Sequence, residues 1–88
     1  MTLLDKLIQI DNWNIISKSI PKDVIVKSKS IATVLEGCGF SVFHTGRDSI
    51  QFEKTSNGEY LEIEVFSDKI ETYHETEEKD CLLNNKIQ

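Results

Sequence analysis

The fold of this chain is decided by residues 48–75, which read DSIQFEKTSNGEYLEIEVFSDKIETYHE. Apolar and polar residues alternate in two runs separated by Asn57-Gly58, and alternation around an Asn-Gly pair is the strongest short-range signal of a β-hairpin. A two-residue turn at this pair places Phe52 opposite Ile63 on the neighbouring strand. The apolar side chains of both strands then share one face, so the pattern and the turn predict the same register.

A third strand is predicted to follow the hairpin. A tight turn at Ser67-Asp68 pairs Val65 with Ile70 and leads into a strand that ends near Glu75. This pairing again sets an apolar side chain against an apolar side chain, which is what fixes the register of a half-buried strand.

A further strand precedes the hairpin at residues 40–44, FSVFH. A three-residue loop at residues 45–47 faces Val42 with Ile50 and keeps Val42 on the apolar face. A two-residue loop exchanges the faces and turns Phe43 inward. We favour the first loop, but the sequence leaves the second open.

Two helices are predicted before the sheet. Apolar residues recur at helical spacing over residues 3–10, and residues 11–14 interrupt that spacing with side chains that favour caps and turns. Residues 15–20 are predicted to be irregular and packed down by their isoleucines. A second amphipathic helix is expected over residues 21–36, where Pro21 suits the first turn. The expected fold is α+β, with two N-terminal helices packed on one face of a four-stranded antiparallel β-meander.

The 88 residues are predicted to form one domain at 1–75, followed by an acidic polar tail at 76–88. Hydrophobic residues make up 39% and charged residues 28%, which is typical of a globular protein in water. No apolar run approaches the roughly 20 residues that span a bilayer. The N-terminus lacks the basic start, the apolar run and the cleavage site of a signal peptide, so we expect a cytoplasmic protein that does not bind membranes.

No catalytic or metal-binding motif is present, so we expect no enzymatic activity, no cofactor and no metal site. Cys38 and Cys81 lack the spacing of a zinc site and are predicted to be reduced thiols. His74 is expected at the margin of the apolar face rather than as a general base. Trp13 could anchor a partner, but we expect it to pack over the junction of the second helix and the sheet.

The acidic residues are concentrated in the C-terminal third of the chain. Net charge is −5, but residues 1–58 hold seven Lys/Arg against six Asp/Glu, whereas residues 59–88 hold three against nine. A negative surface disfavours contact with nucleic acid and attracts a basic protein partner.

The predicted registers set like charges against each other on the polar face of the sheet. Glu53 faces Glu62, and Glu64 faces Glu71, each pair costing something under about 1 kcal/mol. In one interpretation, neighbouring lysines (Lys54 and Lys69) and solvent screening relieve this repulsion. In the other, the face is kept acidic to dock a basic surface, with tyrosines as anchors. The predicted partner-binding residues are Glu53, Tyr60, Glu62, Glu64, Glu71 and Tyr73.

Three segments resemble a family of small bacterial proteins that has no assigned activity. These segments are residues 12–14 (NWN), residues 45–53 (TGRDSIQFE) and residues 57–64 (NGEYLEIE). The resemblance covers residues 5–74 and implies the helix-plus-meander fold without implying an activity. The chain departs from the family where Ile15-Ile16-Ser17 replaces a Tyr-Gly loop and where His44 replaces a proline.

Two functions from different classes follow from these observations. The first is a small acidic protein-binding module that acts stoichiometrically, such as an inhibitor, an antitoxin, an immunity protein or a phage-borne inhibitor of a host defence enzyme. The alternative is a structural or accessory subunit of a larger assembly, including a homodimer through a sheet edge. An enzyme or small-ligand binder needs a pocket that 88 residues rarely spare.

Overall fold

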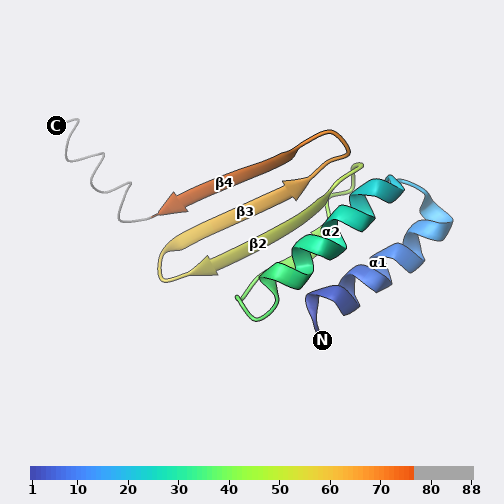
Figure 1. The fold of residues 1–88 in the computed structure, drawn as a ribbon. Helices are drawn as coiled ribbons and strands as arrows, with labels where there is room; N and C mark the ends of the chain where they lie inside the picture. Colours follow the sequence, from blue (N-terminus) through green and yellow to red (C-terminus); the bar gives the residue numbers. More distant parts are fainter. Residues whose placement is uncertain (77–88) are drawn as a thin grey trace.

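The computed structural model describes residues 1–76, in which two helices precede a four-stranded antiparallel sheet of order β1-β2-β3-β4 (Figure 1). The elements are α1 (Leu3–Ser17), α2 (Lys22–Leu35), β1 (Ser41–His44), β2 (Ile50–Ser56), β3 (Glu59–Val65) and β4 (Ile70–Thr76). The predicted α+β fold is confirmed. Of the predicted acidic tail, residues 77–88 lie outside the described residues, and Thr76 is the last residue of β4.

The registers predicted for the last three strands are confirmed. Phe52 lies opposite Ile63 in β2 and β3, and Val65 lies opposite Ile70 in β3 and β4. Asn57-Gly58 forms the central turn with positive φ angles of 51° and 78°. Two successive positive φ angles match the right-handed twist of the flanking strands, which is why this dipeptide fixes the hairpin.

The register predicted between β1 and β2 is wrong by two residues, although its sidedness is right. Val42 lies opposite Phe52, not Ile50, and its side chain is buried on the helix side of the sheet. The connection is longer than predicted because residues 45–49 form a loop with its own hydrogen bonds. The Thr45 N–H donates to the Ser49 carbonyl oxygen at 3.3 Å, and the two hydroxyls lie 2.7 Å apart.

Helix α1 continues to Ser17, so the predicted end at residue 10 is wrong. Lys18 ends the helix in the left-handed region with φ 52°. Asn14 remains helical because its side chain bonds beyond the helix: Oδ1 accepts from the Ile20 N–H at 2.9 Å, and Nδ2 donates to the Ile20 carbonyl oxygen at 2.8 Å. These bonds tie down the connection to α2. Of the isoleucines predicted to pack there, only Ile20 is buried, and Ile15 and Ile16 are exposed.

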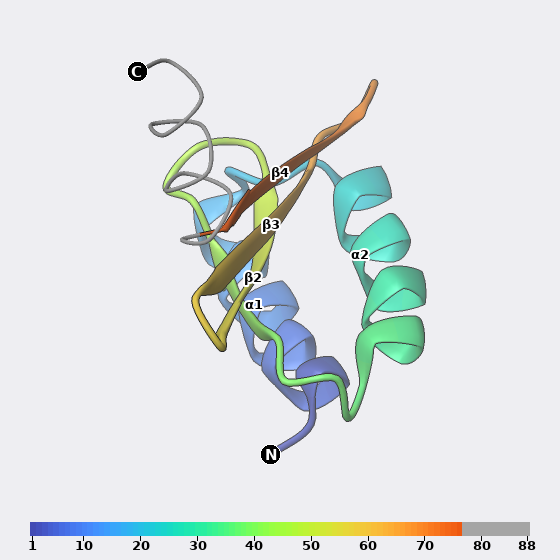
Figure 2. The same ribbon diagram turned by 90° about the vertical axis from the view of Figure 1, so that its left-hand side faces the viewer.

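Both helices cover the same face of the sheet, α1 over β1 and α2 over β2 and β3. Figure 2 shows the strands as one twisted layer with α2 beside it, and in Figure 1 β4 lies on the side of β3 away from the helices. Neither helix within residues 1–76 is long and apolar enough to cross a membrane. The core between the layers consists of Leu3, Leu7, Ile20, Val24, Ile25, Ala32, Val42, Ile50, Phe52 and Val65.

Candidate functional site

The outer face of the sheet, which is the face turned away from the helices, carries the side chains that alternate with the core residues of β2, β3 and β4. Because directly opposite residues of paired strands point to the same side, the registers place all six predicted site residues on this outer face. The predicted like-charge pairs are present: Glu53 lies opposite Glu62, and Glu64 lies opposite Glu71. The structure relieves the repulsion within the two pairs in different ways.

Tyr60 bridges the first pair of carboxylates. Its hydroxyl lies 2.6 Å from Glu62 Oε1 and 3.1 Å from Glu53 Oε2, and its single proton is shared between them. The hydrogen bond to Glu62, partial burial and the second bond to Glu53 raise the pKa of the Tyr60 hydroxyl far above its ordinary value of 10.0. The repulsion between Glu53 and Glu62 is therefore partly offset by a phenol. The lysine expected to help, Lys54, instead places its ammonium 5.7 Å from the centre of the Phe40 ring.

The two predicted anchor tyrosines lie side by side on the outer face, Tyr60 on β3 and Tyr73 on the edge strand β4. The ring centroids of Tyr60 and Tyr73 are 6.2 Å apart with an interplanar angle of 59°, a tilted arrangement that aromatic pairs favour. The Tyr73 hydroxyl donates to Glu75 Oε2 at 2.6 Å. The sheet register thus builds a pair of rings whose hydroxyls hold carboxylates on both sides.

Glu64 has a different environment from the other predicted site residues. It is 6% exposed, and its Oε2 accepts hydrogen bonds from the Ser49 hydroxyl at 2.6 Å and from Arg47 Nη2 at 2.8 Å. Its carboxylate is thus engaged with the loop at residues 45–49 instead of being presented to solvent. We therefore assign Glu64 to holding that loop against the sheet. Sequence reasoning missed this role, and Arg47 and Ser49 beside the hairpin were the signal that could have indicated it.

Glu71, which lies opposite Glu64, is exposed at the surface. Its Oε2 lies 3.2 Å from the ammonium of Lys69, an ion pair between two exposed side chains. Such exposed pairs contribute little to stability and exchange readily with solvent or a partner. Glu71 therefore remains accessible to an incoming cation.

Trp13 does not pack over the junction of α2 and the sheet, as predicted, but against β1. Its ring stacks on His44 at the end of β1, with centroids 4.4 Å apart and an interplanar angle of 23°. The extended helix α1 carries Trp13 to that place, so the error in the helix boundary also displaced the tryptophan.

Within residues 1–76, no group of three or more His, Cys, Asp or Glu side chains is arranged to hold a metal ion. Cys38 is an exposed free thiol, and Cys81 lies outside the described residues. His74 lies opposite Leu61 on the helix side of the exposed edge strand β4, and its Nε2 is 4.0 Å from Glu59 Oε2. Comparison with protein-family models, with curated proteins and with solved structures finds no match to this chain.

Proposed function

We propose that this chain is a protein-binding module whose outer face docks a basic surface of a partner protein. It acts stoichiometrically, in the manner of an inhibitor, an antitoxin, an immunity protein or a phage-borne anti-defence protein, in the cytoplasm. The observation that carries the proposal is the arrangement of Tyr60 between Glu53 and Glu62. The resemblance to small bacterial proteins supports a bacterial or phage setting.

The arrangement favours docking because the carboxylates are already ordered. Tyr60 and Tyr73 hold three of them in fixed positions, namely Glu53, Glu62 and Glu75. Ordering side chains before association lowers the entropy cost of binding a complementary surface. Tyr73 is half exposed and supplies a rigid amphipathic surface on β4, and tyrosine is a residue type enriched among binding hot spots.

The charge of the patch supplies attraction at a distance. Carboxylates of the outer face raise the local concentration of a basic partner and speed its association, an effect that salt screens. Lys or Arg side chains that bind beside Tyr60 would also neutralise the facing charges of Glu53 and Glu62. Binding would then remove a repulsion that the free protein only partly offsets.

The test is charge reversal on the outer face with Glu62→Lys combined with Glu71→Lys. The matched control is Asp48→Lys combined with Asp68→Lys, which changes net charge equally at exposed loop positions at the end of the sheet. Glu64→Lys is unsuitable because it would bury an ammonium beside Arg47. Wild-type protein and both variants are immobilised and exposed to native lysate, and the association rate of the captured protein is then measured at several salt concentrations.

We expect the control to retain the partner and the outer-face variant to lose it. The wild-type association rate should fall as salt increases. Both variants should melt within a few degrees of wild type, because the substituted side chains are outside the core and the lysine introduced by Glu62→Lys faces Glu53 with the opposite charge, which compensates for the lost bond to Tyr60. Equal association of both variants, or a rate that does not respond to salt, contradicts docking through the outer face.

A second candidate function is that of a subunit that assembles through β4. β4 is the last strand of the sheet, so within residues 1–76 only β3 pairs with it. On its helix side, Ile70 is 51% exposed. An apolar side chain on an edge strand favours pairing with another strand. Sedimentation equilibrium of wild type and Ile70→Lys tests this alternative, which requires a wild-type dimer that the substitution dissociates.

A further inference from the structure

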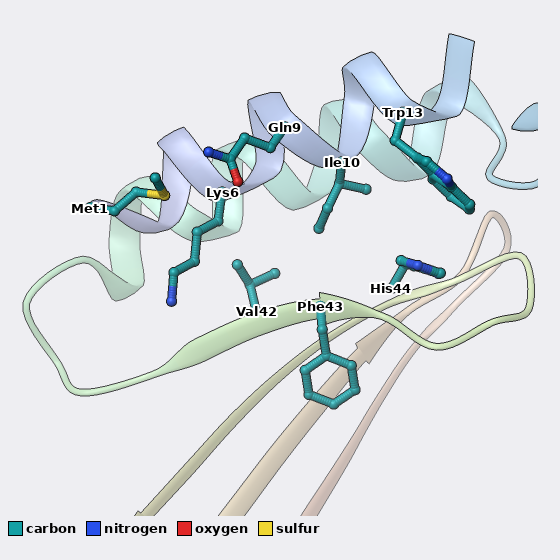
Figure 3. Close-up of a pocket in the computed structure, with 8 residues that line it drawn as sticks. All are labelled: Met1, Lys6, Gln9, Ile10, Trp13, Val42, Phe43 and His44. Atoms are coloured by element: carbon teal, nitrogen blue, oxygen red, sulfur yellow. The ribbon is translucent and has the colours of Figure 1, made fainter. Parts of the chain in front are cut away.

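The groove between α1 and β1 is a second surface, on the opposite side of the sheet from the outer face (Figure 3). It has a volume of about 450 Å³, within the range of known ligand sites. In Figure 3 the side chains of Lys6 and Ile10 extend from α1 towards β1, while Phe43 points away from the helix. Its lining includes Lys6, Gln9, Ile10 and Trp13 of α1 and Val42 and His44 of β1.

The floor of the groove is next to an open edge of the sheet. β1 is the first strand of the order, and within residues 1–76 only β2 pairs with it. The outer edge of such a strand presents backbone N–H and C=O groups that an extended peptide can pair with. A strand added there would direct alternate side chains to the helix side, into the space beneath Ile10 and Trp13.

The wall formed by Trp13 and His44 is suited to an apolar side chain. The two rings are stacked, and the Trp13 side chain remains 42% exposed. A partly exposed tryptophan beside a groove resembles the aromatic anchors that dominate binding energies. Within residues 1–76 its indole N–H has no hydrogen-bond partner, so it is available to donate to a bound segment.

The charge of the groove determines the kind of segment that fits. No carboxylate lines it, and the ammonium of Lys6 has no ion pair among residues 1–76. The Gln9 amide beside it likewise has no hydrogen-bond partner in that part of the chain. An unpaired cation beside apolar surface favours an anionic group on the occupant, because a charge-assisted hydrogen bond there is stronger than a neutral one.

We propose that the groove binds an extended, acidic segment of a partner protein by strand addition to β1. Apolar side chains of the segment lie against Ile10, Trp13 and Val42, and a carboxylate of the segment binds Lys6. This goes beyond the function proposed for the outer face, which attracts the opposite charge, and does not depend on it.

A second copy of this chain fits the groove less well than an acidic segment. A copy that continued the sheet with its helices on the same side would direct the inner residues of its own edge strand towards the groove. These residues are Val42 and His44 from β1, or Ile70, Thr72 and His74 from β4. None of them carries a carboxylate for Lys6.

The experiment begins with a displayed library of random twelve-residue peptides selected on the immobilised full chain. Enriched peptides are synthesised and titrated, with the fluorescence of Trp13, the single tryptophan of the chain, as the signal. We expect sequences with alternating apolar residues and at least one Asp or Glu. Lys6→Glu should weaken their binding by about tenfold or more, since a hydrogen bond to a charged group is lost and like charges are opposed.

Lys22→Glu is the matched control, because it makes the same charge change at an exposed lysine of α2 outside the groove. It should leave peptide affinity unchanged. In a peptide bound as an added strand, every second backbone N–H pairs with the β1 edge. Methylating those nitrogens should abolish binding, whereas methylating the intervening nitrogens should not. If Lys6→Glu does not fold, Lys6→Gln, which removes the charge without reversing it, replaces it in the titration.

Several results overturn the proposal. They are a selection that enriches no peptide, enriched peptides that lack acidic residues, equal binding to the Lys6 variants and the Lys22 control, and binding that backbone methylation leaves intact. A wild-type dimer that an enriched peptide dissociates shows that a second copy occupies the edge and also overturns it.

Discussion

Replacing Tyr60 with phenylalanine should destabilise the protein by removing a single hydroxyl group. In the wild type this hydroxyl lies within hydrogen-bond distance of Glu53 and Glu62, which face each other across β2 and β3. Tyr60→Phe keeps the ring and its contact with Tyr73, so the packing of the outer face is preserved. The substitution therefore isolates the effect of the shared proton on two facing carboxylates.

The magnitude follows from two contributions. One hydrogen bond to a charged group is lost, which we set at about 1 kcal/mol because solvent reaches this half-buried site. The repulsion between Glu53 and Glu62 is then no longer offset, at a further cost of about 0.2–1 kcal/mol. We expect the free energy of unfolding at neutral pH to fall by about 1–2 kcal/mol in total, measured by urea denaturation.

The pH dependence of this difference has a definite sign. The pKa of the Tyr60 hydroxyl is raised in the folded protein above its ordinary value of 10.0, because the protonated phenol bonds the two carboxylates. The contribution of this group to stability is therefore fully present below pH 10 and is lost as pH rises from there towards the folded pKa. The stability difference between wild type and Tyr60→Phe should be constant from pH 7 to about pH 10 and shrink above it.

Two controls make the reasoning refutable. In the Glu53→Gln background, Tyr60→Phe should cost less than in the wild type, because one of the facing charges is gone. In Tyr73→Phe protein, Tyr60 is the single phenol, and its titration should give a pKa above 10.0. Equal stability of wild type and Tyr60→Phe at pH 7, or a Tyr60 pKa at its ordinary value, would show that the phenol does not offset the charge pair.

Two further substitutions test the core and the end of α1. Ser28 is fully buried, and its hydroxyl has no hydrogen-bond partner among residues 1–76, so Ser28→Ala should raise the free energy of unfolding by about 1 kcal/mol. Ser30→Ala, at an exposed site of α2, should raise it by no more than the difference in helix propensity between serine and alanine. An equal gain at both sites would show that burial of the Ser28 hydroxyl has no cost. Asn14→Ala should lower the free energy of unfolding by about 1–3 kcal/mol, because the Ile20 N–H and C=O lose their partners. Asn12→Ala, on the exposed side of the same helix, should change it little. Urea denaturation measures all four variants, and equal effects at Asn14 and Asn12 would refute the bridging role of Asn14.

The resemblance of segments within residues 5–74 to small bacterial proteins stays a prediction, as does the role of the outer face in binding. The predicted site residues do lie on one face, because a strand register carries every side chain with it. Their contacts were less predictable. That Tyr60 reaches both Glu53 and Glu62 depends on a diagonal approach between strands, which alternation alone does not specify.

By itself, the sequence determined the sheet from β2 to β4. The turns at Asn57-Gly58 and Ser67-Asp68 are local, as is the period-two pattern, and they agree, so the register of these strands needed no information from elsewhere in the chain. Tertiary contacts decided the rest of what matters for function. Glu64 is buried because Arg47 and Ser49 reach it from the loop at residues 45–49. The same loop makes the register between β1 and β2 differ by two residues from the predicted one.

In α1, likewise, nearby residues set one end of the helix and tertiary contacts set the other. Its start is local, because Thr2 and Asp5 form reciprocal hydrogen bonds that cap the first turn. Its end is not, because the polar residues predicted to interrupt it find partners beyond the helix: Asp11 pairs with Lys29 of α2 at 3.0 Å, and Asn14 bonds to Ile20. Side chains that favour turns in isolation are retained in a helix when such bonds are available, and only the folded chain brings those partners within reach.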